Sequence, residues 1–291
     1  MWNFGYHFAR SRGGLAREAY RMLLPMIVRR QIDPPRTLDI DVFAYSNQPM
    51  LPEQIASARS FLKYAGRPNN FTIVSDGTHC RRAVSVLRQI DSCIRLASAG
   101  DFLPKQSTLR DYFTSHPTGK QLALIMNLPR ERPALYVDAD VLFFPGAFTL
   151  ADLLRNQDAP ALYLRDCQVA GDERLLRDPA EAANPVNTGV LFFFQKLDWS
   201  SAMERLQQLE GAPNFFTNQT MTHLAMHANG GRPLDPAKFV LRLDDQFQFA
   251  DSYANNSIIL RHYVNPVRHK FWEQIFFVNS RGLPLSHSCA F

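Results

Sequence analysis

The sequence lacks several patterns that would indicate a protein class directly. Its four cysteines include no CxxC pair, which argues against a zinc knuckle or a disulfide framework and makes a reducing cytoplasm the default. No segment reaches the roughly 18 apolar residues of a transmembrane helix. The sequence has no internal repeat and no low-complexity segment. No glycine-rich phosphate loop follows the first expected strand, so a P-loop nucleotide site is not expected.

The composition suits a globular chain whose charge is concentrated at one end. Of the 291 residues 46% are apolar, which is ample for a large core. The net charge of +5 comes from residues 1–36, where seven arginines face Glu18 and Asp33, while the other 25 basic and 25 acidic residues cancel. We therefore expect a basic, helical N-terminal extension over 1–36 and one domain over 37–291, with no nucleic-acid surface.

The N-terminal segment contains no clean apolar stretch followed by a small-residue cleavage site, so a secretory signal is not expected. Residues 15–30 predict an amphipathic helix interrupted near Pro25, with four aromatic residues before it. An arginine-rich helix of this kind suits an anionic membrane surface, here the inner face of the membrane. The interpretation that we favour is a helix that docks on the domain or on a neighbouring subunit, in a cytoplasmic protein.

Strand-like and helix-like stretches alternate after Pro34-Pro35. This alternation predicts an α/β fold with a mixed, mostly parallel sheet flanked by helices. The expected strands cover 37–47, 71–76, 133–144, 160–166, 187–194 and 257–264. The expected helices cover 52–66, 78–90, 118–128, 147–157, 198–209, 217–228 and 266–276, the last with Pro266 at its first position.

The stretch PALYVDADVLFF, residues 133–144, places Asp138 and Asp140 inside an apolar run. Along a strand, residues i and i+2 point to the same face, so both carboxylates can approach one point. Two like charges that close need a shared proton or a cation, and a divalent cation is the simpler answer. The alternative is a turn in which the aspartates cap local backbone N–H groups.

Further polar residues are expected at the same edge, because ligands of open α/β sheets bind beyond the carboxyl ends of the strands. Asp76 ends one expected strand, and His262 lies near the end of another. An imidazole beside two carboxylates shifts the metal preference from Mg²⁺ toward Mn²⁺. Asn187 begins an apolar strand in which Gly189 permits close approach of a ligand.

Three blocks of the sequence, in this order, resemble those of the GT-A glycosyltransferases. They are the Asp-x-Asp between apolar runs, NTGVLFF at 187–193 and HYVNPVRHKFW at 262–272. The closest match is the family 8 branch that contains glycogenin and the bacterial lipooligosaccharide galactosyltransferases, and the resemblance covers residues 38–275. It implies a GT-A fold and a nucleotide-sugar donor whose diphosphate binds Mn²⁺ or Mg²⁺.

The resemblance implies roles for individual residues. The metal ligands would be Asp138, Asp140 and His262, and the base and ribose would rest at the end of the first strand. The residues expected to contact the donor are Ala44, Tyr45, Ser46, Asp76, Lys120, Asp138, Asn187, Gly189, Asn265, Arg268 and Lys270.

The C-terminal block departs from the family pattern H-x-x-G-x-x-K-P-W. Asn265 replaces the glycine, and two extra residues precede Trp272. Counting forward from His262 favours Arg268 as the phosphate contact, whereas counting back from Trp272 favours Lys270. The two are therefore rival phosphate contacts.

The catalytic block departs as well. Retaining members of the family commonly carry Asp-Gln or Glu-Gln beneath the donor sugar, and the matching place here reads Asn218-Gln219. Asp245 offers a carboxylate further along the chain. The catalytic candidates are therefore Asn218, Gln219 and Asp245.

The leading interpretation is a metal-dependent glycosyltransferase that moves a hexose from a nucleotide sugar, with UDP favoured, to a glycan or lipid-linked acceptor. A nucleotidyltransferase remains an alternative, because that chemistry also uses paired aspartates and a metal. A homologue that binds a nucleotide sugar or glycan without turnover is another, suggested by Asn218. A glycoside hydrolase fits less well, because its two carboxylates flank the scissile bond instead of sharing an ion.

Simpler interpretations are preferred for four other residues. His223 and His227 are four apart on an expected helix, but no glutamate stands between them as in metalloproteases, so a packed or solvated pair is favoured. Core packing is expected for Phe215 and Phe216 in preference to an acceptor groove.

Overall fold

The computed structural model describes residues 3–104, 109–129, 131–155 and 158–280, with the backbone alone for 276–280. The helices of these residues are α1 (Phe4–Ile27), α2 (Leu51–Tyr64), α3 (Arg81–Arg88), α4 (Arg110–Ser115), α5 (Pro117–Met126), α6 (Leu150–Arg155), α7 (Ser200–Gln207), α8 (Thr217–Ala228) and α9 (Arg268–Ser280). The strands are β1 (Thr37–Ser46), β2 (Arg67–Ser75), β3 (Ile94–Ser98), β4 (Ala134–Val137), β5 (Val141–Phe143), β6 (Ala161–Arg165), β7 (Val186–Phe193), β8 (Arg232–Pro233), β9 (Phe239–Val240) and β10 (Leu260–His262).

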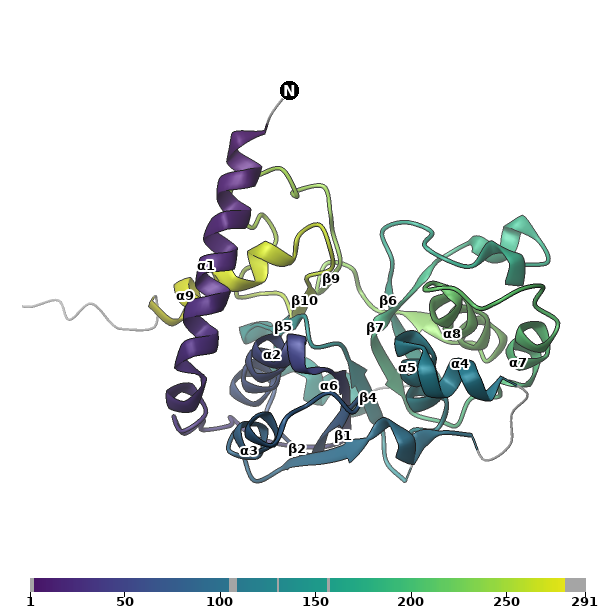
Figure 1. Ribbon diagram of the computed structural model, residues 1–291, viewed down its shortest axis with the longest axis horizontal. Coiled ribbons are helices and arrows are strands. Elements are labelled where there is room, and N and C mark those ends of the chain that lie inside the picture. Colours follow the sequence, from purple (N-terminus) through teal and green to yellow (C-terminus); the bar gives the residue numbers. More distant parts are fainter. Residues whose placement is uncertain (1–2, 105–108, 130, 156–157, 281–291) are drawn as a thin grey trace, which may run out of the picture.

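The expected α/β fold with a mixed, mostly parallel sheet is confirmed. In the described residues the larger sheet has the order β3-β2-β1-β4-β7-β6-β8, in which β7 alone runs antiparallel to its neighbours. Alternate residues of β4 enter two cores, with Leu135 and Val137 on one side and Ala134 and Tyr136 on the other. Helices α1, α2, α3 and α9 lie toward one end of the molecule, and α4, α5, α7 and α8 toward the other (Figure 1).

A second, smaller sheet has the order β5-β10-β9 and corrects the single strand expected over 133–144. The chain leaves the larger sheet after Val137, turns at 138–140, and enters the smaller sheet at Val141. In that turn the Val141 N–H donates to the Asp138 carbonyl at 3.3 Å. Both strands are buried and equally apolar, so the hydrophobic pattern does not reveal the break between them.

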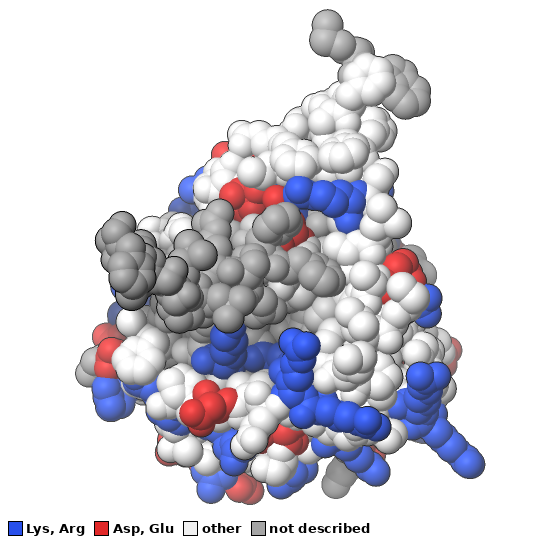
Figure 2. All heavy atoms as spheres, turned by 90° about the vertical axis from the view of Figure 1, so that its left-hand side faces the viewer, with Lys and Arg blue, Asp and Glu red and all other residues white. Residues whose placement is uncertain are grey.

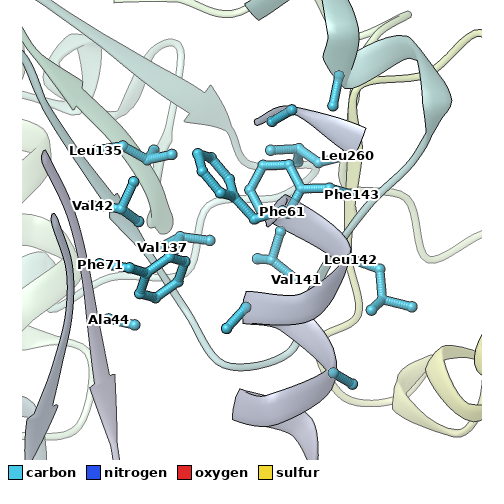
Figure 3. Packing of buried hydrophobic residues seen from close by; sticks show 14 of the residues in the cluster. Val42, Ala44, Phe61, Phe71, Leu135, Val137, Val141, Leu142, Phe143 and Leu260 are labelled. Carbon is cyan, nitrogen blue, oxygen red and sulfur yellow. The ribbon is translucent and has the colours of Figure 1, made fainter. Parts of the chain in front are cut away.

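Phe61 of α2 joins the two sheets. Its ring lies between β1, β2 and β4 on one side and β5 on the other (Figure 3). It meets Phe71 and Phe143 edge to face, with ring centroids 5.8 and 5.0 Å apart. The side chain is fully buried, so this contact belongs to the core that the two sheets share.

The N-terminal helix starts earlier than expected, because Asn3 caps it: the Asn3 Oδ1 accepts from the Tyr6 N–H at 3.1 Å. It then continues through Pro25 and ends at Ile27. Its inner face packs against α9 and α2, with Arg12 paired to Glu273 at 2.5 Å. The helix therefore docks on the domain. Among the described residues, none forms a helix long and apolar enough to cross a membrane.

Several smaller expectations differ from the structure. Helix α9 begins at Arg268, two residues after Pro266, because a turn bonded from the Val267 N–H to the Val264 carbonyl comes first. Phe215 and Phe216 are exposed instead of packed in a core. Helix α4 and strands β3, β8 and β9 were not expected. Residues 156–157 and Cys289 lie outside the described residues, in which the other three cysteines are free.

Replacing Phe61 tests the junction between the sheets. We expect Phe61→Ala to lower the free energy of unfolding by about 3–5 kcal/mol, because it leaves a cavity where the Phe61 ring contacts Phe71 and Phe143. Urea unfolding at 25 °C measures this. Phe215→Ala, at a side chain that is 66% exposed, is the matched control and should cost less than about 0.5 kcal/mol. Equal losses in the two variants would contradict the account.

Candidate active site

Backbone pairing between the two sheets brings three of the expected residues together. The turn after β4 carries Asp138 and Asp140, and β10 lies antiparallel to β5 with His262 opposite Val141. The next residue, Tyr263, donates its N–H to the Asp140 carbonyl at 2.9 Å. His262 is therefore fixed beside a turn that lies more than 120 residues before it in the chain.

The geometry of these three side chains suits a metal ion. One ligand atom from each of Asp138, Asp140 and His262 lies within 4.8 Å of the other two. The His262 Nε2 is 3.0 Å from Asp140 Oδ1 and 3.7 Å from Asp138 Oδ2. Ligands about 2.1 Å from one ion are about 3–4 Å apart, so small side-chain shifts would complete the set. In the described part of the chain it is the one such group of three.

His262 is held in the orientation that a ligand needs. The Asn187 side-chain oxygen lies 3.0 Å from the His262 Nδ1. An amide oxygen only accepts, so Nδ1 carries the proton and Nε2 faces the carboxylates. Asn187 is itself fixed, because its Nδ2 donates to Asp166 at 2.9 Å. At Gly189 an added Cβ would lie 2.1 Å from the His262 ring, so only glycine fits.

The two aspartates differ in charge stabilisation. Burial raises the pKa of Asp138 to about 6, with a further contribution from the Asp140 charge and opposition from His262. Burial acts in the same direction on Asp140, but the charges and hydrogen bonds of His262 and Arg268 outweigh it and lower its pKa to about 2. The Arg268 Nη2 donates to Asp140 at 2.5 Å. A metal cation bound between Asp138 and Asp140 would stabilise the ionised form of both carboxyl groups.

A chain of amides continues from Asp138 toward α8. The Tyr136 hydroxyl and the Gln121 Nε2 both donate to Asp138 Oδ1, at 2.8 and 3.0 Å. The Gln121 Oε1 accepts from Asn218 at 2.9 Å. Asp138 Oδ2 takes neither bond, so it is free to coordinate an ion. The carboxylates thus contact side chains from other elements, which argues against the alternative of a turn capped by its own aspartates.

Two of these contacts were missed from the sequence. Tyr136 lies two residues before Asp138, and the rule that i and i+2 share a face would have identified it. Gln121 follows Lys120, but which of the two faces the aspartates depends on the rotation of α5. Asp166 receives the amides of Asn187 and Gln219, both at 2.9 Å, and so supplies a carboxylate next to the expected catalytic pair.

The donor residues expected near the first strands lie at the carboxyl ends of β1 and β2. The Lys120 Nζ donates to the Asp76 carbonyl at 3.2 Å. The Tyr45 hydroxyl and Ser46 Oγ are buried without a hydrogen-bond partner in the described residues. Ala44 differs, because its side chain belongs to the core beside Phe71 (Figure 3). Only the backbone of Ala44 could therefore face a ligand.

Lys270 and Asp245 are placed away from the aspartates. Lys270 is fully buried and donates to the carbonyls of Gln248 and Ala250, at 3.1 and 2.6 Å. Asp245 pairs with Arg261 at 2.9 Å and is 1% exposed. The structure does not bring these residues to the site, whereas Arg268 reaches it. The different outcomes for Arg268 and Lys270 follow from the start of α9, which turns positions 268 and 270 to different faces.

The histidine pair on α8 is structural. The Nε2 atoms of His223 and His227 contact the carbonyls of Glu181 and Asn184, at 2.5 and 3.1 Å. Arg205 adds bonds to the Glu181 carboxylate at 2.7 and 2.8 Å. The irregular segment 167–186 is therefore held against α7 and α8, beside the expected catalytic pair.

Comparison with known proteins gives structural matches only. No protein-family model and no curated protein matches the sequence. A galactosyltransferase, LgtC, solved with donor and acceptor sugar analogues, matches with TM-score 0.54 and 14% identity over 83% of this chain and 95% of its own. Mouse xyloside xylosyltransferase 1 matches with TM-score 0.52 and 13% identity over 80% and 99%. The glycosyltransferase GlyE of Streptococcus pneumoniae matches with TM-score 0.52 and 15% identity over 84% and 64%. The chain has the GT-A fold of these glycosyltransferases, as expected.

Removing the charge of Asp138 tests the electrostatics of the site. Asp138→Asn keeps the Oδ1 acceptor for Tyr136 and Gln121 but removes a carboxylate whose pKa is raised in the folded state. In EDTA at pH 7.5 we expect the variant to melt about 2–4 °C above wild type, which corresponds to about 1 kcal/mol. The gain should shrink as the pH falls from about 6 toward 4, because the wild-type carboxyl then binds its proton. A gain that persists at pH 4, or none at pH 7.5, would contradict this.

Proposed function

We propose that the protein is a metal-dependent glycosyltransferase that moves a hexose from a nucleotide sugar, with UDP favoured, to a glycan or lipid-linked acceptor. The observation that carries the proposal is the Asp138, Asp140 and His262 cluster, assembled at the carboxyl edge of a GT-A sheet. The donor set of two carboxylates and one imidazole suits Mn²⁺, or Mg²⁺. Bound there, such an ion would neutralise negative charge on a departing nucleoside diphosphate.

The protein's own cations would assist at the same place. Arg268 lies against Asp140 with its side chain 37% exposed, so its remaining donors can reach a phosphate oxygen. Lys120 lies beside the end of β2 and could meet the nucleotide from the other side. Positive charge on both sides of a diphosphate stabilises it as it leaves.

The donor sugar would lie next to the amide and carboxylate chain. Gln219 and Asn187 both hold Asp166, and Asn218 holds Gln121. These fixed polar groups can orient hydroxyls of a hexose without moving during transfer. Asp166 supplies the carboxylate that Asn218 does not, so an aspartate is available beside the sugar even though the family position lacks one.

Asn218 also motivates the second candidate, a homologue that binds a nucleotide sugar without turnover. If wild type binds the donor but transfers nothing, Asn218→Asp is the test. Transfer that appears only in this variant would favour the binding protein. Transfer by wild type would reject it.

Nucleotide binding tests the proposed function. We would record melting temperatures of wild type, Asp140→Asn and His227→Ala with UDP, GDP, CMP and dTDP, each with and without Mn²⁺. A ligand at about 100 times its dissociation constant adds about 2.7 kcal/mol. We expect one nucleotide, UDP first, to stabilise wild type and His227→Ala only with Mn²⁺, and Asp140→Asn not at all. No metal-linked shift with any nucleotide would reject the proposal.

Contact with an anionic membrane surface is a further part of the proposal. Five large apolar side chains of α1 are 61–79% exposed and lie at spacings of four or seven residues, so they form one line along the helix. They are Phe4, Phe8, Leu15, Met22 and Met26. Figure 2 views the end of the molecule at which α1 and α9 lie and shows more lysines and arginines than acidic residues, most of them in its lower half. Apolar side chains flanked by cations are typical of helices that lie in the surface of an anionic bilayer.

Vesicle co-sedimentation tests this contact. Full-length protein should bind vesicles of phosphatidylcholine and phosphatidylglycerol, and the combined Phe4→Ser, Phe8→Ser and Met22→Ser variant should bind at least about tenfold less, because each lost side chain removes apolar burial. Phe215→Ser with Phe216→Ser is the control, since it removes exposed aromatics elsewhere. Equal binding by all three proteins would contradict a contact through α1.

A further inference from the structure

We infer that a cleft between α1 and α9 binds a phosphate ester next to the metal cluster. The cleft has a volume of about 420 Å³. Arg10 and Gly14 of α1 line one side, and Arg268 and Trp272 of α9 line the other. Because Arg268 also donates to Asp140, the cleft adjoins the cluster through one side chain.

Two residues that line the cleft carry buried N–H groups without a hydrogen-bond partner among the described residues. Trp272 is 2% exposed, and its indole Nε1–H has no hydrogen-bond partner within the described chain. The Arg268 Nε–H is buried without a partner in the same way. A buried N–H without an acceptor costs about 1–3 kcal/mol, so a ligand oxygen that reached either group would recover that loss.

The charge of the cleft selects an anion. Arg10, Arg17 and Arg268 line it, and the carboxylates of Glu53 and Asp140 face Arg17 and Arg268. Glu53 is already matched by Arg17, at 2.5 and 3.1 Å. Among the described residues, the Arg10 side chain makes one long hydrogen bond, 3.4 Å, to the Tyr6 hydroxyl. Most of its donors are therefore available, and a guanidinium suits phosphate because two of its N–H groups can bind two oxygens.

A neighbouring acceptor favours an ester over free phosphate. His269 lines the cleft, and its Nδ1 lies 3.1 Å from the Pro266 carbonyl, so Nδ1 carries the proton of the neutral ring. The Nε2 is then an acceptor, and it has no partner in the described residues. A hydroxyl beside the phosphate would satisfy it.

The helix crossing leaves the cleft open at one place. At Gly13 an added Cβ would lie 2.6 Å from the His269 carbonyl, so the helices touch there. One residue further, a Cβ on Gly14 would have no atom within 4 Å. A larger side chain at position 14 can therefore fill the cleft without moving either helix.

The position of the cleft assigns its ligand to the acceptor, an assignment that rests on the proposed function. A donor diphosphate bound at Asp138, Asp140 and His262 would leave the α1 side of Arg268 free. A phosphate on the acceptor, carried by a soluble sugar or by a lipid, would occupy that side. Arg268 would then lie between two phosphate groups, one from each substrate.

Calorimetric titration in EDTA tests the cleft apart from the metal cluster. Full-length wild type should bind glucose 1-phosphate, and Arg10→Gln should weaken binding at least about tenfold through loss of a charged donor. Gly14→Leu should abolish binding. Arg21→Gln is the control, because Arg21 lies on the same helix, pairs with Glu18 and does not line the cleft. The proposal would be overturned if wild type did not bind glucose 1-phosphate, or if Arg10→Gln and Gly14→Leu bound it as tightly as wild type does.

Two further measurements identify the source of the phosphate and separate this inference from the proposed function. In the first, vesicles with and without phosphatidic acid replace the soluble ester. If the protein binds only the vesicles that contain phosphatidic acid, and Arg10→Gln weakens that binding, the ligand is a lipid phosphate. Melting with UDP and Mn²⁺ should be unchanged in Arg10→Gln. If wild type binds no nucleotide but binds the ester in an Arg10-dependent manner, the phosphate site in the cleft is supported and its role in glycosyl transfer is rejected.

Discussion

The antiparallel pairing of β10 with β5 is the contact on which the site depends. It joins the C-terminal block of the chain to the turn that follows β4, and the Tyr263 N–H bond to the Asp140 carbonyl fixes the register. A slip of one residue would turn His262 to the opposite face. Phe61 packs the second sheet against the first through its contacts with Phe71 and Phe143. Gly189 leaves the space in which the His262 ring lies.

The two neighbouring aspartates lower the stability of the folded protein. Burial and the neighbouring Asp140 raise the pKa of Asp138, so the protein holds two close carboxylates of which one is ionised at a cost. His262 and Arg268 stabilise Asp140, whereas the His262 Nε2 lies farther from Asp138 Oδ2, at 3.7 Å. In the ion pairs around Arg261 the charges balance, because Arg261 and Lys270 face Asp245 and Asp251. Close carboxylates with shifted pKa values are typical of binding sites.

The sequence predicts the fold class and the grouping of Asp138, Asp140 and His262, but not the contacts that depend on helix rotation and packing. The apolar flanks drew attention to Asp138 and Asp140, and the resemblance added His262; the structure brings the three together, although the aspartates lie on a turn and not on a continuous strand. Arg268 and Lys270 could not be separated, because the choice depends on where α9 begins. Gln121 and the cleft beside Gly14 arise from the rotation of α5 and the crossing of α1 over α9, and no local pattern encodes either.

The most direct test of the account is a titration of Mn²⁺, followed by electron paramagnetic resonance, into wild type and His262→Ala in the presence of UDP. The account predicts saturable binding of one ion per chain in wild type and loss of that binding in the variant, since the substitution removes one of the three proposed ligands. Absence of saturable binding in wild type, or binding that survives in His262→Ala, would contradict the claim that Asp138, Asp140 and His262 form a metal centre.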